Sequence, residues 1–283
     1  MSELRESGLI RLVPRLGRTG AWFLPPWAVL CGAIASSRLH PSLDDGVRLA
    51  LSVLLVEGGW GTLWSALGTT DWAALFEQWR GWVDSSPVPS IPYAQPGSPA
   101  ERFTFWLSRL RSWWRKVLIP TAGPALGAAM VGSAVSLLVA LALGPETLIL
   151  TLGVLALMEL ALLSRRGQIP VSGGWDGVLR TGAPWLVGHL AFGSLTLTSV
   201  ALAGAFSLAA AGADGQSRRA WIGGQALAAL LLISLHQPLT ATFLALLLIP
   251  QWLLLARPAL SNPAYQHALP WLAAAMLLAA LAV

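Results

Sequence analysis

The chain has 283 residues, of which 55% are hydrophobic and only 11% are charged, and its mean hydropathy is +0.64. A soluble domain carries roughly 25% charged residues, so the composition excludes an ordinary soluble protein. The net charge of +5 does not point to nucleic acid as a partner, because basic cytoplasmic loops give membrane proteins the same excess. Recurring apolar runs of about 17–25 residues predict an all-α, polytopic transmembrane bundle.

The apolar runs predict about nine membrane spans in a single domain that covers residues 1–283. In chain order they are residues 22–38, 46–68, 118–143, 146–163, 176–194, 197–212, 220–236, 239–256 and 267–283. With a cytoplasmic N-terminus, 15 of the 18 Lys and Arg residues fall on the cytoplasmic side, as the positive-inside rule requires. An eight-span alternative would fuse residues 183–212 and leave Arg218 and Arg219 outside, so nine spans are preferred.

The long connection after the second span, residues 69–117, is expected to form a cytoplasmic cap with two amphipathic helices. Thr70 and Asp71 are suited to cap and begin the first helix. A linker with five Pro, residues 85–100, precedes the second helix, residues 101–116. That helix has basic residues around an apolar stripe of Phe103, Trp106, Leu107, Leu110 and Trp114. Two placements suit it: the membrane interface, or the protein's own cytoplasmic face.

Four segments of the chain, taken in order, resemble the bacteriochlorophyll and chlorophyll synthases of the UbiA prenyltransferase superfamily. They are residues 10–37, with Trp-Phe-Leu-Pro-Pro-Trp at the first span; 172–188, SGGWDGVLRTGAPWLVG; 217–225, SRRAWIGGQ; and 262–271, NPAYQHALPW. The resemblance implies a UbiA-like bundle in a bacterial cytoplasmic (inner) membrane, with a substrate cavity that opens to the cytoplasm.

The chain departs from these synthases at both of their Asp-rich motifs. Where the first motif has Asn-Asp-x-x-Asp-x-x-x-Asp, this sequence has Thr70, Asp71, Ala74 and Gln78 at the motif positions. The second motif is missing, because residues 212–216 run directly into Ser217. Ionisation of an allylic diphosphate needs Mg²⁺ held by several carboxylates. We therefore expect a pseudoenzyme with no catalytic residue; the alternative is an active, Mg²⁺-dependent prenyltransferase with a tetrapyrrole or aromatic acceptor.

Ionisable residues within or at the ends of the predicted spans are candidates for a polar cavity, because such residues are costly in a membrane. They are Glu57, Glu159, His189 and His236. The cytoplasmic mouth of a UbiA-like cavity is where Glu159 and His236 are expected. The alternative for Glu57 and Glu159 is a structural carboxylate bonded to a neighbouring helix. His189 is either an axial ligand to the magnesium of a chlorin or a satisfied core residue.

Together these features favour a non-catalytic, bacteriochlorophyll-synthase-like subunit or assembly factor of a photosynthetic membrane complex. Its expected ligands are bacteriochlorophyll, a quinone or an isoprenoid lipid, and its expected partners are membrane lipids and other membrane subunits, not nucleic acid. Small residues in the fifth and sixth spans, among them Gly188 and Gly204, suit close helix contact with such subunits or within the chain itself. A transporter or channel is less favoured, since no paired half-helix signature is visible.

Overall fold

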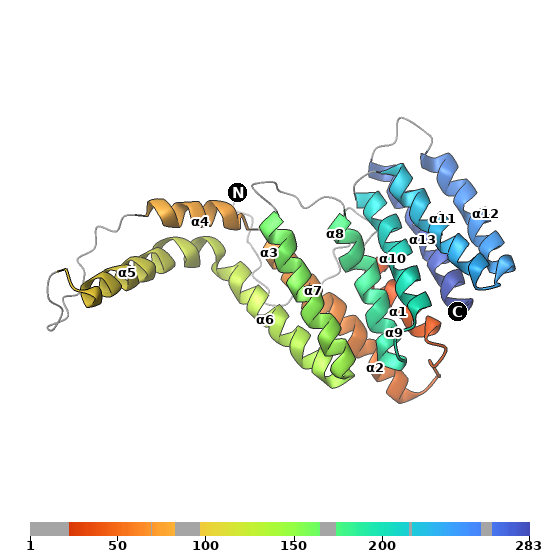
Figure 1. Ribbon diagram of the computed structural model, residues 1–283, viewed down its shortest axis with the longest axis horizontal. Helices are drawn as coiled ribbons and strands as arrows, with labels where there is room; N and C mark the ends of the chain where they lie inside the picture. Colours follow the sequence, from red (N-terminus) through yellow and green to blue (C-terminus); the bar gives the residue numbers. More distant parts are fainter. Residues whose placement is uncertain (1–22, 69, 83–96, 165–173, 215–216, 256–261) are drawn as a thin grey trace, which may run out of the picture.

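A computed structural model describes residues 23–68, 70–82, 97–164, 174–214, 217–255 and 262–283. In these residues the regular structure is helical: long helices lie side by side in a bundle, and an arm of two helices leaves it sideways (Figure 1). The helix bounds are α1 Leu24–Ala35, α2 Leu43–Val53, η2 Leu54–Gly61, α3 Thr62–Gly68, α4 Trp72–Gly81, α5 Pro99–Trp113, η3 Trp114–Leu118, α6 Ile119–Leu143, α7 Pro145–Ser164, α8 Gly174–Gly177, η4 Val178–Gly182, α9 Ala183–Phe192, α10 Leu197–Asp214, α11 Arg218–Ser234, α12 Pro238–Leu255 and α13 Asn262–Leu281.

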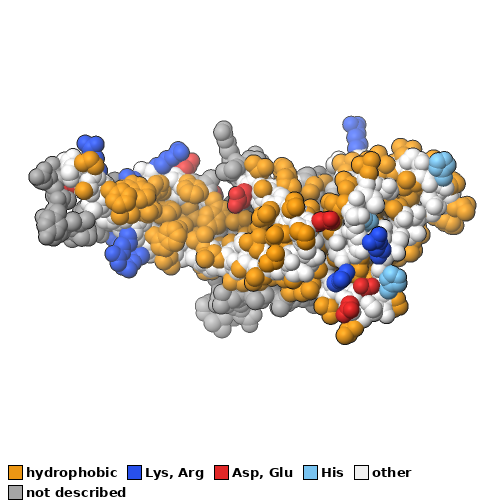
Figure 2. Space-filling view, turned by 60° about the horizontal axis from the view of Figure 1, so that its bottom comes forward, with side chains coloured by type: hydrophobic (Ala, Val, Ile, Leu, Met, Phe, Trp, Pro, Cys, Tyr) orange, Lys and Arg blue, Asp and Glu red, His pale blue; other side chains and the backbone are white. Residues whose placement is uncertain are grey.

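The all-helical class predicted from the sequence is confirmed, and the helices have the character of membrane helices. Three described helices are long and apolar enough to cross a membrane: Leu43–Gly68, Pro99–Leu143 and Pro238–Leu255. Other apolar helices are shorter, such as α1 with 12 residues. Each predicted span contains a helix, but nine crossings remain a prediction. Hydrophobic side chains cover most of the visible face of the bundle (Figure 2).

The second amphipathic helix and the third predicted span are one continuous helix, Pro99–Leu143. The sequence analysis expected them as separate elements. Pro120, the second residue of α6, lacks an N–H and crowds the carbonyl four residues earlier, which normally ends or kinks a helix. Here the wide π-helical turn η3 precedes that proline and accommodates the misfit. Pro184 at the start of α9 follows the π-helical turn η4 in the same way.

Glycines set the closest helix contacts in the bundle. A Cβ built on Gly188 of α9 would overlap the Val29 carbonyl of α1, and one on Gly32 of α1 would overlap the Trp185 carbonyl of α9. Gly224 of α11 lies equally close to α10. Small residues therefore let the backbones touch, as is common between membrane helices. At Gly188 this contact is internal to the chain, whereas Gly204 of α10 faces open space.

A buried polar cluster joins α11 to α12. Gln251 Oε1 accepts hydrogen bonds from Trp221 Nε1 and Gln225 Nε2, each at 2.8 Å, and Gln251 Nε2 donates to Gln225 Oε1 at 2.9 Å. Satisfied bonds of this kind are strong in a medium of low dielectric constant. Near the same helix ends, the Arg218 guanidinium lies 4.9 Å from the centre of the Trp252 ring. These contacts fix the antiparallel register of α11 and α12.

Connections that the nine-span prediction puts on the outer side meet at one end of the bundle. Arg38, Gly144 and Gly193, from the connections α1–α2, α6–α7 and α9–α10, line one pocket there. At the opposite end Gly177 of α8 packs on the last turns of α10, and Gly212 of α10 packs on Trp221 near the start of α11. The arm leaves from this second end (Figure 1). Basic residues of segments 1–22, 165–173 and 256–261 lie outside the described residues.

This arrangement predicts the accessibility of single cysteines. In a Cys31→Ser background, Ser98→Cys on the arm and Ser217→Cys before α11 should react with a membrane-impermeant maleimide from the same, cytoplasmic side. His40→Cys, in the exposed connection α1–α2, should react only from the other side. Labelling of inside-out and right-side-out vesicles measures this. Reaction of Ser98→Cys and Ser217→Cys from opposite faces would restore the eight-span alternative.

Candidate functional site

The candidate site centres on two charged side chains in two π-helical segments of the bundle. Glu57 lies in η2 and Arg180 lies in η4, and the two interact electrostatically. By the rise of a helix, Glu57 is roughly 16 Å from the Gly68 end of its helix. Glu57 is exposed at the surface of the bundle, and Arg180 is half-buried. A carboxylate and a guanidinium at this depth are costly unless they interact with each other or with a ligand.

A hydrogen bond next to the pair ties the same two helices together. Trp64 Nε1, in α3, donates to Asp176 Oδ1, in α8, at 2.9 Å. Asp176 is buried, so the indole N–H offsets part of the cost of enclosing its carboxylate. Since Trp64 follows Glu57 and Asp176 precedes Arg180 along their helices, the bond holds both π-helical segments in register.

Polar atoms without a hydrogen-bond partner add to the polarity of this region. Among the described residues, Trp60 Nε1 of η2, Thr181 Oγ1 of η4 and Thr151 Oγ1 of α7 are buried and make no hydrogen bond. Apolar side chains of η2, η4 and α7 pack together in one cluster, which includes Leu55, Met158 and Leu179. A buried donor or acceptor without a partner costs about 1–3 kcal/mol. The region therefore offers hydrogen-bonding groups that a polar headgroup could satisfy.

The degenerate first motif has a structural role. Asp71 Oδ1 accepts a hydrogen bond from the Ala74 backbone N–H at 3.0 Å and so caps α4, whereas the sequence analysis expected Thr70 as the cap and Asp71 in the first turn. Thr70 directly precedes this cap, and Gln78 is exposed on α4. Within the described ranges, no three His, Cys, Asp or Glu residues are placed to hold a metal ion. These residues do not fit a Mg²⁺–diphosphate site of the synthase type; the side chain of Asp214 lies outside the described ones.

The expectation that Glu159 and His236 share a cytoplasmic mouth is wrong. Glu159 lies near the Ser164 end of α7 and is exposed, because the buried side of that helix carries Thr151, Val154 and Met158. His236 lies in the turn after α11, with a left-handed φ of 59°. Helix α11 starts at Arg218, at the same end of the bundle as Ser164 of α7, and runs to the other end. His236, which follows α11, therefore lies at the end opposite to Ser164. Neither residue joins Glu57 and Arg180.

His189 is enclosed between α9 and α1. Its side chain is 2% exposed, and Nε2 lies 3.0 Å from the carbonyl oxygen of Ser194. Because the residue is almost fully enclosed and Nε2 is engaged by the Ser194 carbonyl, a macrocycle has no access to that nitrogen. The ring therefore does not fit an axial ligand of a chlorin. Its geometry is that of a core histidine that closes the end of α9.

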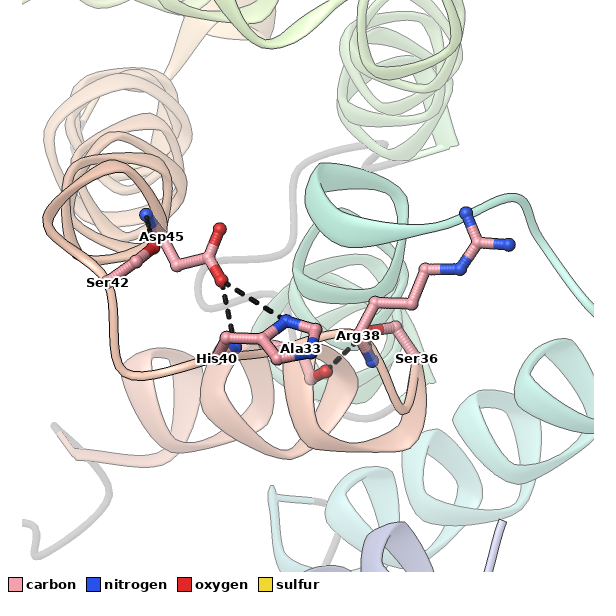
Figure 3. A network of polar contacts seen from close by, with 6 residues as sticks. All are labelled: Ala33, Ser36, Arg38, His40, Ser42 and Asp45. Atoms are coloured by element: carbon pink, nitrogen blue, oxygen red, sulfur yellow. Dashed lines mark hydrogen bonds and ion pairs between the residues drawn. The ribbon is translucent and has the colours of Figure 1, made fainter.

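A pocket of about 400 Å³ lies at the other end of the bundle, away from Asp71 and Asp176. Its rim carries Arg38, Arg48 and Glu146. Beside it, the His40 backbone N–H donates to Asp45 Oδ2 at 2.8 Å, while the Arg38 side chain points away from this pair (Figure 3). Ser42 caps α2 through Asp45, so this network orders the connection α1–α2.

The sequence analysis singled out Glu57 and missed its neighbours. It placed Arg180 in the fifth span and Asp176 at that span's start, without connecting either with Glu57. An arginine inside an apolar span was the available signal, because such a residue is a functional candidate by default. Only the tertiary fold reveals the interaction.

In comparisons with known proteins, the chain matches no protein-family model, no curated protein and no solved structure. The site is therefore interpreted from its own geometry.

Proposed function

We propose that this protein is a non-catalytic, integral membrane protein that holds an amphipathic ligand within a UbiA-like bundle of nine spans. The observation that carries the proposal is the Glu57–Arg180 interaction on two π-helical turns. Apolar helix surfaces surround it, so a ligand with a polar headgroup and a long apolar part suits the region. A pigment such as bacteriochlorophyll, a quinone and an isoprenoid lipid all have this character.

The absence of catalysis is supported by the role of Asp71. Its carboxylate is engaged by the Ala74 N–H, and Ala74 and Gln78 supply no carboxylate where the synthases have two. Hard Mg²⁺ prefers several oxygen ligands in octahedral geometry. A scaffold that keeps its helices but lacks these ligands is suited to binding and not to prenyl transfer.

We further propose that the protein acts as a subunit or assembly factor of a photosynthetic complex in a bacterial inner membrane. The sequence resemblance to bacteriochlorophyll synthases motivates this proposal. Exposed large side chains on α12, such as Phe243, Trp252 and Leu253, are available to lipids or to neighbouring subunits. Purification of the untagged protein as a free monomer, without pigment, would leave the subunit proposal without support.

Removing the Glu57 carboxylate should reduce the bound ligand. We expect protein purified in mild detergent to carry pigment, quinone or isoprenoid lipid, and Glu57→Gln to lower its molar content about tenfold, as loss of a hydrogen bond to a charged group implies. Solvent extraction followed by absorption spectroscopy and mass spectrometry measures the content.

Glu159→Gln is the matched control, because it makes the same chemical change on an exposed side of α7 and should leave the content unchanged. Equal loss in both variants would contradict the proposed site.

The same preparations, supplied with Mg²⁺, geranylgeranyl diphosphate and a chlorophyllide, should show no prenyl transfer. Turnover that disappears in Asp71→Ala would instead establish the active transferase.

A further inference from the structure

The arm of α4 and α5 carries an apolar stripe that no described part of the protein covers. The stripe consists of side chains that are exposed by 42–60%: Phe103, Trp106 and Leu107 of α5 and Trp114, the first residue of η3. Their spacing places them on one face, because each residue turns an α-helix by about 100°. Together they form an exposed hydrophobic surface along this helix.

The position of α4 explains why the stripe is free. Arg109 Nη2 donates to the carbonyls of Trp79 and Arg80 at 3.0 and 3.1 Å, and Trp82 Nε1 donates to Ser112 Oγ at 3.0 Å. The rings of Trp79 and Trp113 meet edge to face at 5.4 Å. Thus α4 packs on the side of α5 that bears Arg109, Ser112 and Trp113. Leu110, in the middle of the apolar face, is half-buried against the same cluster, whereas the four side chains of the stripe stay exposed.

Basic residues flank the stripe on both sides. Arg102 and Arg111 lie about 80–100° from its centre around the helix, and both are exposed. Figure 2 shows basic and hydrophobic side chains beside one another on the arm. Aromatic residues flanked by arginines are typical of helices that lie in the headgroup region of a membrane. The charge is complementary to anionic lipids.

The connection to α6 sets the position of α5 along the axis of the bundle. Because α5 continues into α6 without a break, the Trp113 end of α5 lies at the level where the apolar helix α6 would leave a membrane. In Figure 1, α5 runs sideways from the end of α6, and α4 lies on its far side from the body of the bundle. The uncovered stripe can therefore meet the bilayer while α4 stays in water.

We propose that α5 lies in the headgroup region of the adjoining leaflet, with the stripe of Phe103, Trp106, Leu107 and Trp114 inserted and Arg102 and Arg111 bound to anionic lipid phosphates. The partner is the lipid surface itself. The proposal requires that the bundle crosses a bilayer, and it is independent of any ligand near Glu57.

A matched pair of probes tests the orientation of the arm. Phe103→Cys and Phe105→Cys exchange the same residue type at similar exposure, 60% and 53%, two positions apart. The two side chains point about 160° apart. Each variant, as full-length protein in a Cys31→Ser background, is labelled with an environment-sensitive fluorophore and placed in nanodiscs. The lipids are anionic or zwitterionic and carry bromine near the top of the acyl chains.

In anionic nanodiscs we expect the label at position 103 to be quenched about threefold or more beyond that at 105, as an inserted stripe implies. Quenching at 103 should fall with zwitterionic lipid and in the variant R102Q/R111Q. A label at Met130→Cys, exposed on α6, should be quenched in every disc. Two outcomes would overturn the proposal: equal quenching of the labels at positions 103 and 105, or no quenching at either position. If the label at position 130 is still quenched, the bundle itself lies in the bilayer. Shielding of position 103 only after addition of a second membrane protein would also overturn the proposal.

Discussion

Arg180→Gln should lower the melting temperature of the protein in detergent by about 2–4 °C. The substitution leaves the Glu57 carboxylate without the cation with which it interacts. Breaking a fully buried pair costs about 3–5 kcal/mol, but Glu57 is exposed, so about 1 kcal/mol is expected here. A change of 1 kcal/mol corresponds to about 2–4 °C in the melting temperature of a larger domain. Differential scanning fluorimetry of the purified variant measures the shift.

A second substitution distinguishes loss of the Glu57–Arg180 interaction from loss of the Arg180 side chain itself. The double variant Glu57→Gln with Arg180→Gln should recover much of the stability, because neither charge is then left alone. Arg219→Gln, which removes an exposed cation at the start of α11, should have little effect. A double variant as unstable as the sum of the two single variants would show that the two charges are not coupled.

Gly188→Ala should destabilise the contact between α1 and α9. The added Cβ would overlap the carbonyl of Val29, which is backbone and cannot swing aside. Overpacking of this kind costs about 1–3 kcal/mol or more, since the two helices must move apart. The melting temperature should fall, and α1 should become more sensitive to limited proteolysis. Both measurements use the full-length protein in detergent.

Gly204→Ala is the control for this effect. Gly204 lies in the middle of α10, and a Cβ there would meet no other atom within 4 Å. Alanine is favoured over glycine in a helix by up to about 1 kcal/mol, so this variant should be as stable as the parent or slightly more stable. Equal destabilisation at positions 188 and 204 would contradict the packing seen between α1 and α9.

The sequence determined the helical class and the position of each helix, because both follow from local chemistry. Apolar runs predicted the helices, and the start of α4 was predicted to within one residue, with Thr70 expected as the cap in place of Asp71, because capping depends on neighbouring residues. The amphipathic helix 101–116 was predicted for the same reason. The continuous helix Pro99–Leu143 was not, since a π-helical turn before Pro120 depends on detailed backbone geometry.

The tertiary structure decided which polar residues meet. Glu57 and Arg180 are more than a hundred residues apart, and only the tertiary fold brings their charges close enough to interact. The same fold separates Glu159 from His236, which the sequence could not reveal because their distance depends on the direction of whole helices. It also shows which side of α5 is covered: α4 packs on the side with Arg109, and Phe103, Trp106 and Leu107 stay exposed. Hydrophobic periodicity marks the apolar face of a helix, but the partner of that face depends on contacts distant in sequence.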